Sequence, residues 1–456
     1  MDRVSAVFWF RRRVTGYGFS PLCAAFALVW LFLPPAYGQR LNDWAGENQR
    51  WLERQIVPNG LVPEPDPTRR RLLMSLELSP VKFPRNFHRS AIYDDALGAI
   101  ALLAGGKTDE SAFILHAISR LVRADGSLWF GYNTANNWPD ESDHSGALIR
   151  AGAVGWMGYS LTFYLTFAPP CQAADNGCTR ERAAFLATAV RLAKYLRSLE
   201  ISDQNHPAHG LVRLGYGDTS LRYDPKTKTV IESYKDEPAL GASTENNISA
   251  WFFLRQLGQL THDSQWNTAA DRIRDALLRA AWDGKEGRFD QGFFASGARD
   301  SRKALDCASW GALFFMAIGE NEKARRSLES AELFLSRDGE AAGYRPYYDQ
   351  QIYPDAEVGA FFFPQNPSRR WRELPLVWSE GSLGVALAHL RSGDAARCRQ
   401  ILESLKPLQV SGSALRYAST DVPHFMSDAP GVAAASWLVL VTQALAGNPA
   451  MEKFWR

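Results

Sequence analysis

The sequence predicts an all-α protein in which six inner and six outer helices form a double-layered toroid. Six segments are apolar on nearly every side, so a helix formed by any of them must be buried on every side. Each is followed or preceded by an amphipathic segment that can cover it from outside. The spacing between the pairs is unequal, which excludes helical repeat arrays because their repeats keep a fixed period. Together these observations indicate one closed ring.

The elements follow this alternation along the chain. Inner helices are expected at 95–104, 146–167, 245–260, 306–318, 380–390 and 432–446. Outer helices are expected at 42–55, 109–122, 180–199, 265–282, 321–335 and 395–405. The inner segments are rich in small residues, such as Gly384 with Ala388 and Gly311 with Ala312, which let helices approach closely at the centre of a ring.

The connections differ in length at the two ends of the predicted ring. Turn signals such as Gly105-Gly106 and Gly393-Asp394 end most inner segments, so short turns are expected at that end. The long, aromatic-rich connections are 125–143, 202–243, 284–304, 339–377 and 408–429, with short strands expected at 211–216 and 228–233. Long loops gathered at one face commonly carry function. The functional face is therefore expected where the inner helices begin.

The first 38 residues are typical of a secretory signal peptide. Arg11-Arg12-Arg13 precedes the apolar stretch 22–33, and small residues at Ala36 and Gly38 flank a cleavage point. We expect cleavage after Gly38, a periplasmic or secreted protein, and a single catalytic domain at 39–456. An uncleaved N-terminal anchor is the alternative. No second apolar stretch is long enough to span a bilayer, which needs about 20 residues, so no stable membrane insertion is expected after signal removal.

Charge and cysteine content narrow the classes of partner. The formal net charge is +2, and loss of residues 1–38 removes four arginines and one aspartate, which leaves a near-neutral chain. This charge gives no electrostatic case for nucleic acid. Cys171 and Cys178 bracket a polar loop and are expected to form a local disulfide, whereas Cys307 is expected to be a buried thiol. No cysteine has metal-site spacing and no cofactor motif is present, so neither metal nor cofactor is expected; the oligomeric state stays open.

The twelve-helix alternation resembles the six-hairpin, or (α/α)6-barrel, glycosidase superfamily across residues 42–446. The resemblance also rests on short phrases at successive inner-helix starts, which are Tyr-Asp-Asp-Ala (93–96), Ser-Thr-Glu-Asn-Asn (243–247), Leu-Asp-Cys-Ala-Ser-Trp (305–310) and Trp-Ser-Glu-Gly (378–381). Members are mostly glycoside hydrolases, with some polysaccharide lyases and sugar epimerases. The resemblance implies a glycan substrate and cleavage of a polysaccharide or oligosaccharide, with no family assigned.

Acidic residues at the inner-helix starts are the candidate catalytic groups. Glycoside hydrolysis requires one carboxyl group that protonates the leaving oxygen and another that activates water or attacks the anomeric carbon. The predicted catalytic residues are Glu380, Glu245, Asp94 and Asp306. Glu380, next to Trp378, suits the acid, Asp94 or Glu245 suits the base, and inversion is the expected stereochemistry. The competing interpretation is that these acids cap helices, because Asp and Ser are ordinary N-caps. Glu245 and Glu380 are more telling because Glu is a poorer cap, whereas Asp95 suits a structural hydrogen bond.

Aromatic and polar side chains are the candidate sugar contacts, because sugar rings stack on aromatic faces. The predicted substrate-binding residues are Tyr93, Trp129, Tyr132, Trp138, Asn246, Trp310, Trp378 and His424. Further loop aromatics with the same potential are Tyr216, Tyr223, Phe289, Phe293, Tyr344, Tyr347, Trp371, Tyr417 and Phe425. Asp140, Glu141, Asp143 and His144 form a second polar cluster that suits either a cation, a catalytic acid or, more simply, a solvated loop.

Two other functions remain open from the sequence. A polysaccharide lyase or sugar epimerase would rely on His144, His424, Tyr93 and Arg416 for a base and for holding an anionic substrate. A non-catalytic glycan-binding protein of an envelope polysaccharide system would use the same acids only as helix caps.

Overall fold

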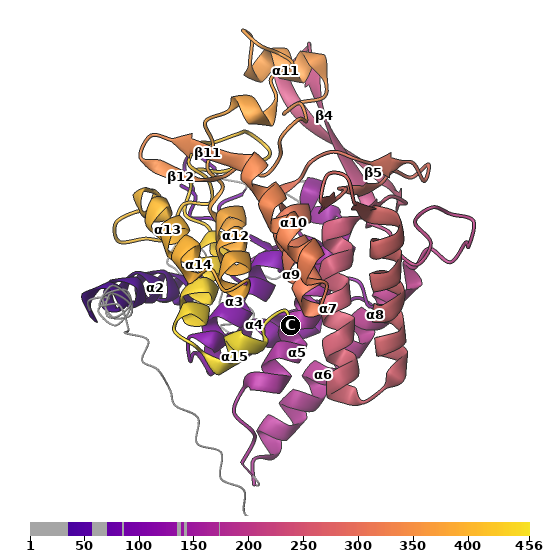
Figure 1. Cartoon of the computed structure of the whole chain (residues 1–456), viewed down its shortest axis with the longest axis vertical. Coiled ribbons are helices and arrows are strands. Elements are labelled where there is room, and N and C mark those ends of the chain that lie inside the picture. Colours follow the sequence, from indigo (N-terminus) through magenta and orange to yellow (C-terminus); the bar gives the residue numbers. More distant parts are fainter. Residues whose placement is uncertain (1–34, 57–70, 84–85, 135–137, 141–143, 173) are drawn as a thin grey trace, which may run out of the picture. The chain divides into compact units, whose positions relative to one another are not determined.

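The computed structural model describes residues 35–56, 71–83, 86–134, 138–140, 144–172 and 174–456 (Figure 1). The chain divides into two compact units, residues 1–44 and 45–456, and the second unit contains the ring. Most of the predicted signal segment and the Pro-rich stretch 58–67 lie outside the described residues. The expected cleavage after Gly38 therefore stays a prediction.

Six helices form the inner layer of the ring, as the apolar segments predict. They are α3 (Ile92–Ala104), α5 (Ala151–Phe167), α7 (Thr244–Thr261), α9 (Leu305–Ala317), α12 (Ser379–Arg391) and α14 (Val432–Leu445). Each contacts the next in this order, and α14 contacts α3, so the layer closes on itself. Their residues are almost all buried, which explains why the sequence carries apolar side chains on every face of these helices.

The outer helices cover the inner ones as antiparallel partners. They are α4 (Thr108–Leu121), α6 (Asn176–Ser198), α8 (Ser264–Ala276), α10 (Asn321–Ala331) and α13 (Ala395–Leu405), each packed on the inner helix that precedes it. Residues 45–56 of α2 (Pro35–Ile56) take the sixth place. In that segment Gln49 Nε2 donates to Gly105 O at 3.0 Å, and Asn48 Nδ2 donates to Gln409 Oε1 at 3.0 Å. The all-α toroid predicted from the sequence is confirmed.

One inner helix begins later than its apolar pattern predicts. The segment expected at 146–167 is helical only from Ala151, because β3 (Ile149–Arg150) pairs with β4 (Gly215–Asp224). Residues His144–Ala147 form a 3-10 turn before that strand. The apolar pattern does not reveal this because a buried strand and a buried helix start are both apolar.

Short antiparallel strands occupy the loops at the starts of the inner helices. The pairs are β1 (Arg89–Ala91) with β2 (Gly131–Asn133), β7 (Trp282–Asp283) with β8 (Arg288–Phe289), and β11 (Leu335–Asp338) with β12 (Ala341–Tyr344). A three-stranded group joins β6 (Ala242–Ser243), β9 (Gly292–Phe293) and β10 (Arg299–Asp300). The longest hairpin is β4 with β5 (Thr229–Ala239), and β4 contacts α11 (Ala356–Phe362) above the ring (Figure 1).

Aromatic side chains fill the centre of the ring. Trp156 of α5 contacts Trp310 of α9 and Trp437 of α14, with ring centroids 5.4 Å and 6.1 Å away. Trp455, which follows the short helix α15 (Pro449–Lys453), stacks on Trp156 at 4.6 Å and on Phe252 at 4.5 Å. The interior of the toroid is therefore a packed core and not a channel at this level.

A disulfide bond joins the connection between α5 and α6 to the first turn of α6. Cys171 and Cys178 are joined, with their Cα atoms 5.7 Å apart. Cys307 and Cys398 are buried free thiols. The bond closes a short loop at the end of the ring opposite the long connections.

Candidate active site

Four of the six inner helices place a carboxyl group in their first turn. Glu245, Asp306 and Glu380 are each the second residue of their helix, and Asp94 is the third residue of α3. Because these helices are arranged around one ring with the same direction, their first turns meet at the same end. The corresponding second residues of α5 and α14 are Gly152 and Ala433, which carry no bulky side chain. The four predicted catalytic acids thus lie on one face.

Glu380 is the most secluded of the four, with only 5% of its surface exposed. Its Oε1 accepts a short hydrogen bond from the Tyr93 hydroxyl, and the Tyr417 hydroxyl is a second donor. The pKa of Glu380 is raised to about 8, mainly by burial; the charges of Asp94 and Glu245 act in the same direction, and hydrogen bonds from the two tyrosines oppose the shift. Glu380 is therefore largely protonated at neutral pH.

Asp306 and Glu245 stand at the starts of neighbouring helices, and the charge of Glu245 affects the pKa of Asp306. Burial raises the pKa of Asp306 well above its usual range, and the charges of Glu245 and Glu380 act in the same direction. Asp306 Oδ1 is buried and has no hydrogen-bond partner among the described residues. Burial also raises the pKa of Glu245, to about 7. Both residues keep partial solvent exposure, so water reaches this pair from the loop face.

The adjacent residues Asp94 and Asp95 have different surroundings. Asp95 is fully buried and accepts hydrogen bonds from Leu73 N and the Ser90 hydroxyl, both at 2.8 Å, so it ties two loop segments to α3. Asp94 is partly exposed on the ring side. Burial raises the pKa of Asp94 to about 7, opposed by hydrogen bonds from Ser75 and the Ala433 amide and by the charge of Arg89. Asp94 thus belongs to the acid cluster, whereas Asp95 is structural.

Three tyrosines surround the acid cluster. Tyr93 bonds Glu380 and in turn accepts the indole N–H of Trp437 at 3.3 Å. Tyr347 has its pKa raised by burial and next by Glu245 and Asp306, which places it beside that pair. Tyr417 is likewise affected by burial and by Glu380. The cluster thus combines hydroxyl and carboxyl groups with aromatic rings. This combination suits the binding of sugars, whose rings carry several hydroxyl groups.

Backbone pairing fixes the helix starts that carry these acids. The Thr244 amide donates to Gln291 O at 2.9 Å, and the Leu305 amide donates to Pro346 O at 2.9 Å. The Trp378 amide donates to Tyr344 O at 2.8 Å. In each of these three helices the first helical residue or the residue before it is thus bonded to a neighbouring loop, and this anchoring limits the movement of the first helical turn.

The predicted substrate-binding residues divide into several groups. Tyr93 lies in the acid cluster, and Trp378 packs edge-on against Tyr417 at 6.3 Å. Tyr132 and Trp310 are 1% and 2% exposed and belong to the core. Asn246 is held between α5 and α7 against Gly152.

The remaining three predicted contacts lie on loops. Trp129 is covered by the Arg123 guanidinium, which lies 4.2 Å from the centre of its ring. Trp138 is 64% exposed, and His424 is an exposed residue with a positive φ of 67°. None of these three is among the groups with the largest effect on the pKa of an acid in the cluster.

Of the residues considered for a lyase or epimerase, Tyr93 lies in the acid cluster and the others lie elsewhere. His144 is in the 3-10 turn before β3 with its ring 6.4 Å from that of Tyr234, and Arg416 lies 3.7 Å from Asp428. Asp140 of the second acidic cluster is buried and lies 3.7 Å from Arg89, while Glu141 and Asp143 are outside the described residues.

Several residues of the site were not singled out from the sequence. Trp437, Trp156 and Ser75 contact Tyr93 or Asp94. Trp156 and Trp437 lie within uniformly apolar helices, where the sequence predicts that a tryptophan belongs to the core. Ser75 follows a stretch that contains no motif. Only the closure of the ring brings them to the acids.

Metal-binding groups and membrane-spanning helices are both absent from the described residues. No group of three or more His, Cys, Asp or Glu side chains in this part of the chain is arranged to hold a metal ion. No helix within the same residues has both the length and the apolar character needed to cross a bilayer.

Comparison with known proteins gives similarity in structure but not in sequence. No family model and no curated protein sequence matches the chain. A glycosidase superposes with a TM-score of 0.57 at 13% identity, covering 92% of this chain and 100% of its own. A D-mannose isomerase gives 0.56 at 9% identity, with 91% and 99% covered. A family GH76 α-mannanase from Bacteroides thetaiotaomicron gives 0.53 at 10%, with 89% and 96% covered. At such identities the likeness concerns the fold. The chain therefore has an (α/α)6-barrel fold, which it shares with these glycosidase, isomerase and α-mannanase structures.

Proposed function

We propose that this protein is a glycoside hydrolase that cleaves a polysaccharide or oligosaccharide with carboxyl groups from the starts of its inner helices. The observation that carries the proposal is the convergence of Asp94, Glu245, Asp306 and Glu380 in one partly exposed cluster. Two carboxyl groups with different proton affinities are the requirement for glycosidic hydrolysis. The glycosidase and α-mannanase neighbours share the fold and support this choice over an unrelated chemistry.

The pKa differences suggest how the roles divide. Glu380, with a pKa of about 8, holds its proton more strongly than Glu245 and Asp94, so it suits the general acid that protonates the leaving oxygen. Glu245 and Asp94, each with a pKa of about 7, are ionised in a larger fraction and suit the base that activates water. We propose Glu380 as acid, Glu245 or Asp94 as base, and inversion at the anomeric carbon. A periplasmic or secreted location belongs to the same proposal.

The structure gives less support to a lyase or epimerase on this scaffold. Such an enzyme removes a proton next to a carboxylate or carbonyl and needs a base and cations for an anionic substrate. Tyr93 offers a tyrosine base beside Glu380, but the groups that act on the pKa of Asp306 and Glu380 include no histidine as a base and no arginine to hold an anionic substrate. Arg89 is the cation that acts on Asp94, and it lies 3.7 Å from Asp140.

The test uses the full-length protein against a panel of neutral and uronic acid glycans that includes α-mannans. New reducing ends and unsaturated product ends are measured together. We expect reducing ends without unsaturation, and a loss of 10²-fold or more in Glu380→Gln and Glu245→Gln, on the order of what acid–base groups contribute. The anomer formed first, followed by proton NMR, distinguishes inversion from retention.

Asp95→Asn is the matched control, because Asp95 is a buried acid one residue from Asp94 that takes no part in the cluster. It should retain most of the activity. Unsaturated ends would replace the proposal with a lyase. Sugar binding without cleavage, unchanged in Glu380→Gln, would instead identify a glycan-binding protein.

A further inference from the structure

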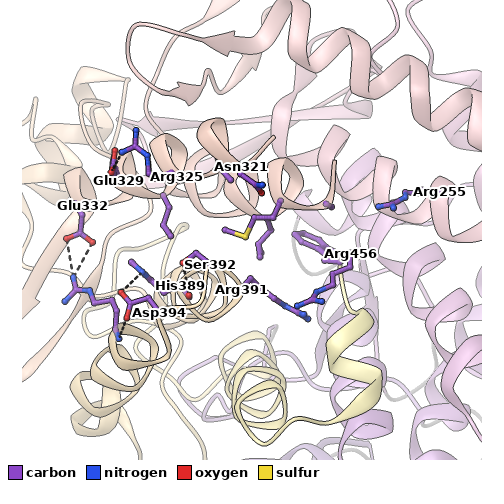
Figure 2. Close-up of a pocket in the computed structure, with 17 residues that line it drawn as sticks. Arg255, Asn321, Arg325, Glu329, Glu332, His389, Arg391, Ser392, Asp394 and Arg456 are labelled. Carbon is purple, nitrogen blue, oxygen red and sulfur yellow. Dashed lines mark hydrogen bonds and ion pairs between the residues drawn. The ribbon is translucent and has the colours of Figure 1, made fainter. Parts of the chain in front are cut away.

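The end of the ring opposite the acid cluster contains a second concave site. Its main pocket has a volume of about 1020 Å³ and is lined by the ends of α9 and α12, by α10 and α13, and by Trp455 and Arg456 (Figure 2). Two further depressions, of about 600 and 550 Å³, adjoin it through Arg255, which lines all three. A pocket of this size accommodates a small molecule.

Charged residues divide the main pocket into two parts. On one side, each acid has a cationic or N–H partner. Glu332 pairs with Arg397 at 3.2 Å, Glu329 pairs with Arg325, and Asp394 accepts the Arg397 amide at 2.9 Å. Figure 2 shows these acids on one side of the pocket, with Arg391, Arg456 and Arg255 on the other. The three acids in this part of the pocket therefore all have partners within the protein.

The second part contains three guanidinium groups without a carboxylate partner among the described residues. Arg391 donates to the carbonyl oxygens of Glu452 at 2.9 Å and Phe454 at 3.2 Å, which hold its position, and the nearby charge of Glu452 offsets part of its own. Arg255 lies over the ring of Trp251 at 5.0 Å, and its Nη1 is buried without a hydrogen-bond partner. We name Arg255, Arg391 and Arg456 the arginine cluster.

Electrostatic repulsion acts within this cluster. The pKa of Arg391 is lowered to about 10, mainly by burial and next by the neighbouring charge of Arg456. Burial also lowers the pKa of Arg255. Arg255 and Arg391 are partly buried, Arg456 is exposed, and Asp271 offsets part of the charge of Arg255. An anion placed between the three guanidinium groups would relieve the repulsion that remains.

Helix capping accounts for only one member of the cluster. Cations are favourable near helix C-termini, and Arg391 is the last residue of α12. Arg255 lies six residues before the end of α7, and Arg456 follows α15, so neither lies in the last turn of a helix. Trp455 forms the apolar wall beside them, with its ring parallel to Phe252 at an angle of 7°. Its φ of 54° shows that local packing holds the backbone in a strained conformation there.

We propose that the arginine cluster binds a small, multiply charged anion at a site separate from the acid cluster. Guanidinium groups bind phosphoryl and carboxylate oxygens through paired N–H donors, so either a phosphorylated or a polycarboxylate compound fits the chemistry. The occupant sits at the ends of the same inner helices whose starts carry the acids, so the two sites lie at opposite ends of the ring.

Calorimetric titration of the full-length protein with inorganic pyrophosphate and with citrate tests this site. We expect saturable 1:1 binding with a Kd below about 1 mM for at least one probe, weakened at least fivefold between 50 and 300 mM NaCl because the contacts are ionic. Arg255→Gln and Arg456→Gln should each weaken binding at least tenfold. Preference for pyrophosphate assigns the site to phosphoryl compounds, and preference for citrate assigns it to polycarboxylates.

Arg325→Gln is the control, because it removes the same charge from the same pocket at a residue paired with Glu322 and Glu329. It should change the Kd less than twofold, and all variants should show the circular dichroism spectrum of the parent. The proposal is overturned if neither probe binds at 10 mM, or if all three variants weaken binding equally. Because Glu380→Gln should bind the probes normally, this result is independent of the hydrolase test.

Discussion

The Tyr93–Glu380 contact shows how one residue can set the chemistry of another. Glu380 is buried and carries a raised pKa, and the Tyr93 hydroxyl opposes that rise by donating a hydrogen bond to the carboxylate. The indole N–H of Trp437 donates a hydrogen bond to the Tyr93 hydroxyl and so positions it. The three residues come from α3, α12 and α14, so the proton affinity of the proposed acid depends on contacts across the ring.

Replacement of Tyr93 by Phe should therefore raise the pKa of Glu380. A net hydrogen-bond contribution of about 0.5–1.5 kcal/mol corresponds to roughly 0.4–1.1 pH units. Because Glu380 must be protonated to act as the acid, activity falls as pH rises through its pKa. The alkaline limb of the pH–kcat profile should thus move to higher pH in Tyr93→Phe.

Tyr347→Phe provides the comparison, since Tyr347 lies beside Glu245 and Asp306 and is not a donor to Glu380. Its alkaline limb should stay close to that of the wild type. An unchanged limb in Tyr93→Phe, or an equal shift in both variants, would contradict the assignment of Glu380 as the acid.

At the level of helices, α5 and α7 approach each other closely at Gly155. A Cβ atom added at Gly155 would lie 3.1 Å from Ala250 N and 3.2 Å from Ser249 C. These are backbone atoms of the facing helix, which cannot rotate away as the end of a side chain can. At Gly384 of α12, which the sequence singles out for close approach, the nearest atom would be Trp310 Nε1 at 3.4 Å, an ordinary contact.

The same Gly→Ala change should consequently have opposite effects at these two positions. Gly155→Ala should lower the free energy of unfolding by about 1 kcal/mol or more, because overpacking outweighs the gain in helix propensity. Gly384→Ala should be neutral or stabilising by up to about 1 kcal/mol, because alanine favours the helix and finds space. Urea denaturation of both variants measures the difference. Equal effects would show that α5 and α7 can separate at little cost.

For the whole molecule, the acid cluster makes stability depend on pH. Asp94, Asp95, Glu245 and Glu380 have pKa values of about 7 to 8 in the folded state, and in the unfolded chain they return to about 4. Between these values the folded protein holds more protons than the unfolded chain, so raising the pH favours unfolding. Stability should fall between about pH 5 and pH 8 by at most 1.4 kcal/mol per pH unit for each group, and by less for the partly exposed ones.

A series of thermal denaturation curves from pH 5 to pH 8.5 measures this dependence. The Tm should decrease across the range by several degrees, on the order expected for a few kcal/mol. The double variant Glu245→Gln/Glu380→Gln should show a shallower decrease, because two of the titrating groups are gone. A Tm that rises with pH, or a slope identical in the double variant, would contradict the raised pKa values.

The helical alternation and the end of the ring that carries the acids can both be predicted from the sequence. A helix that is buried on all sides needs apolar residues on all its faces. The acids at the starts of α7, α9 and α12 interrupt this apolar pattern, so they stand out in the sequence. The cysteine spacing likewise indicated the pair that the structure joins, because Cys171 and Cys178 are close along the chain. In each case the physical cause acts over a few residues.

Only the tertiary structure decided which residues face one another. Asp94 and Asp95 are neighbours in the same first turn, yet the turn of the helix directs one to the acid cluster and the other to Leu73 and Ser90. Tyr93, Trp437 and Glu380 meet because the ring closes between α14 and α3, segments separated by more than 300 residues. The arginine cluster has the same origin, since Arg255, Arg391 and Arg456 share no local pattern. Contacts between such distant positions depend on the packing of whole helices, and no local sequence pattern records them.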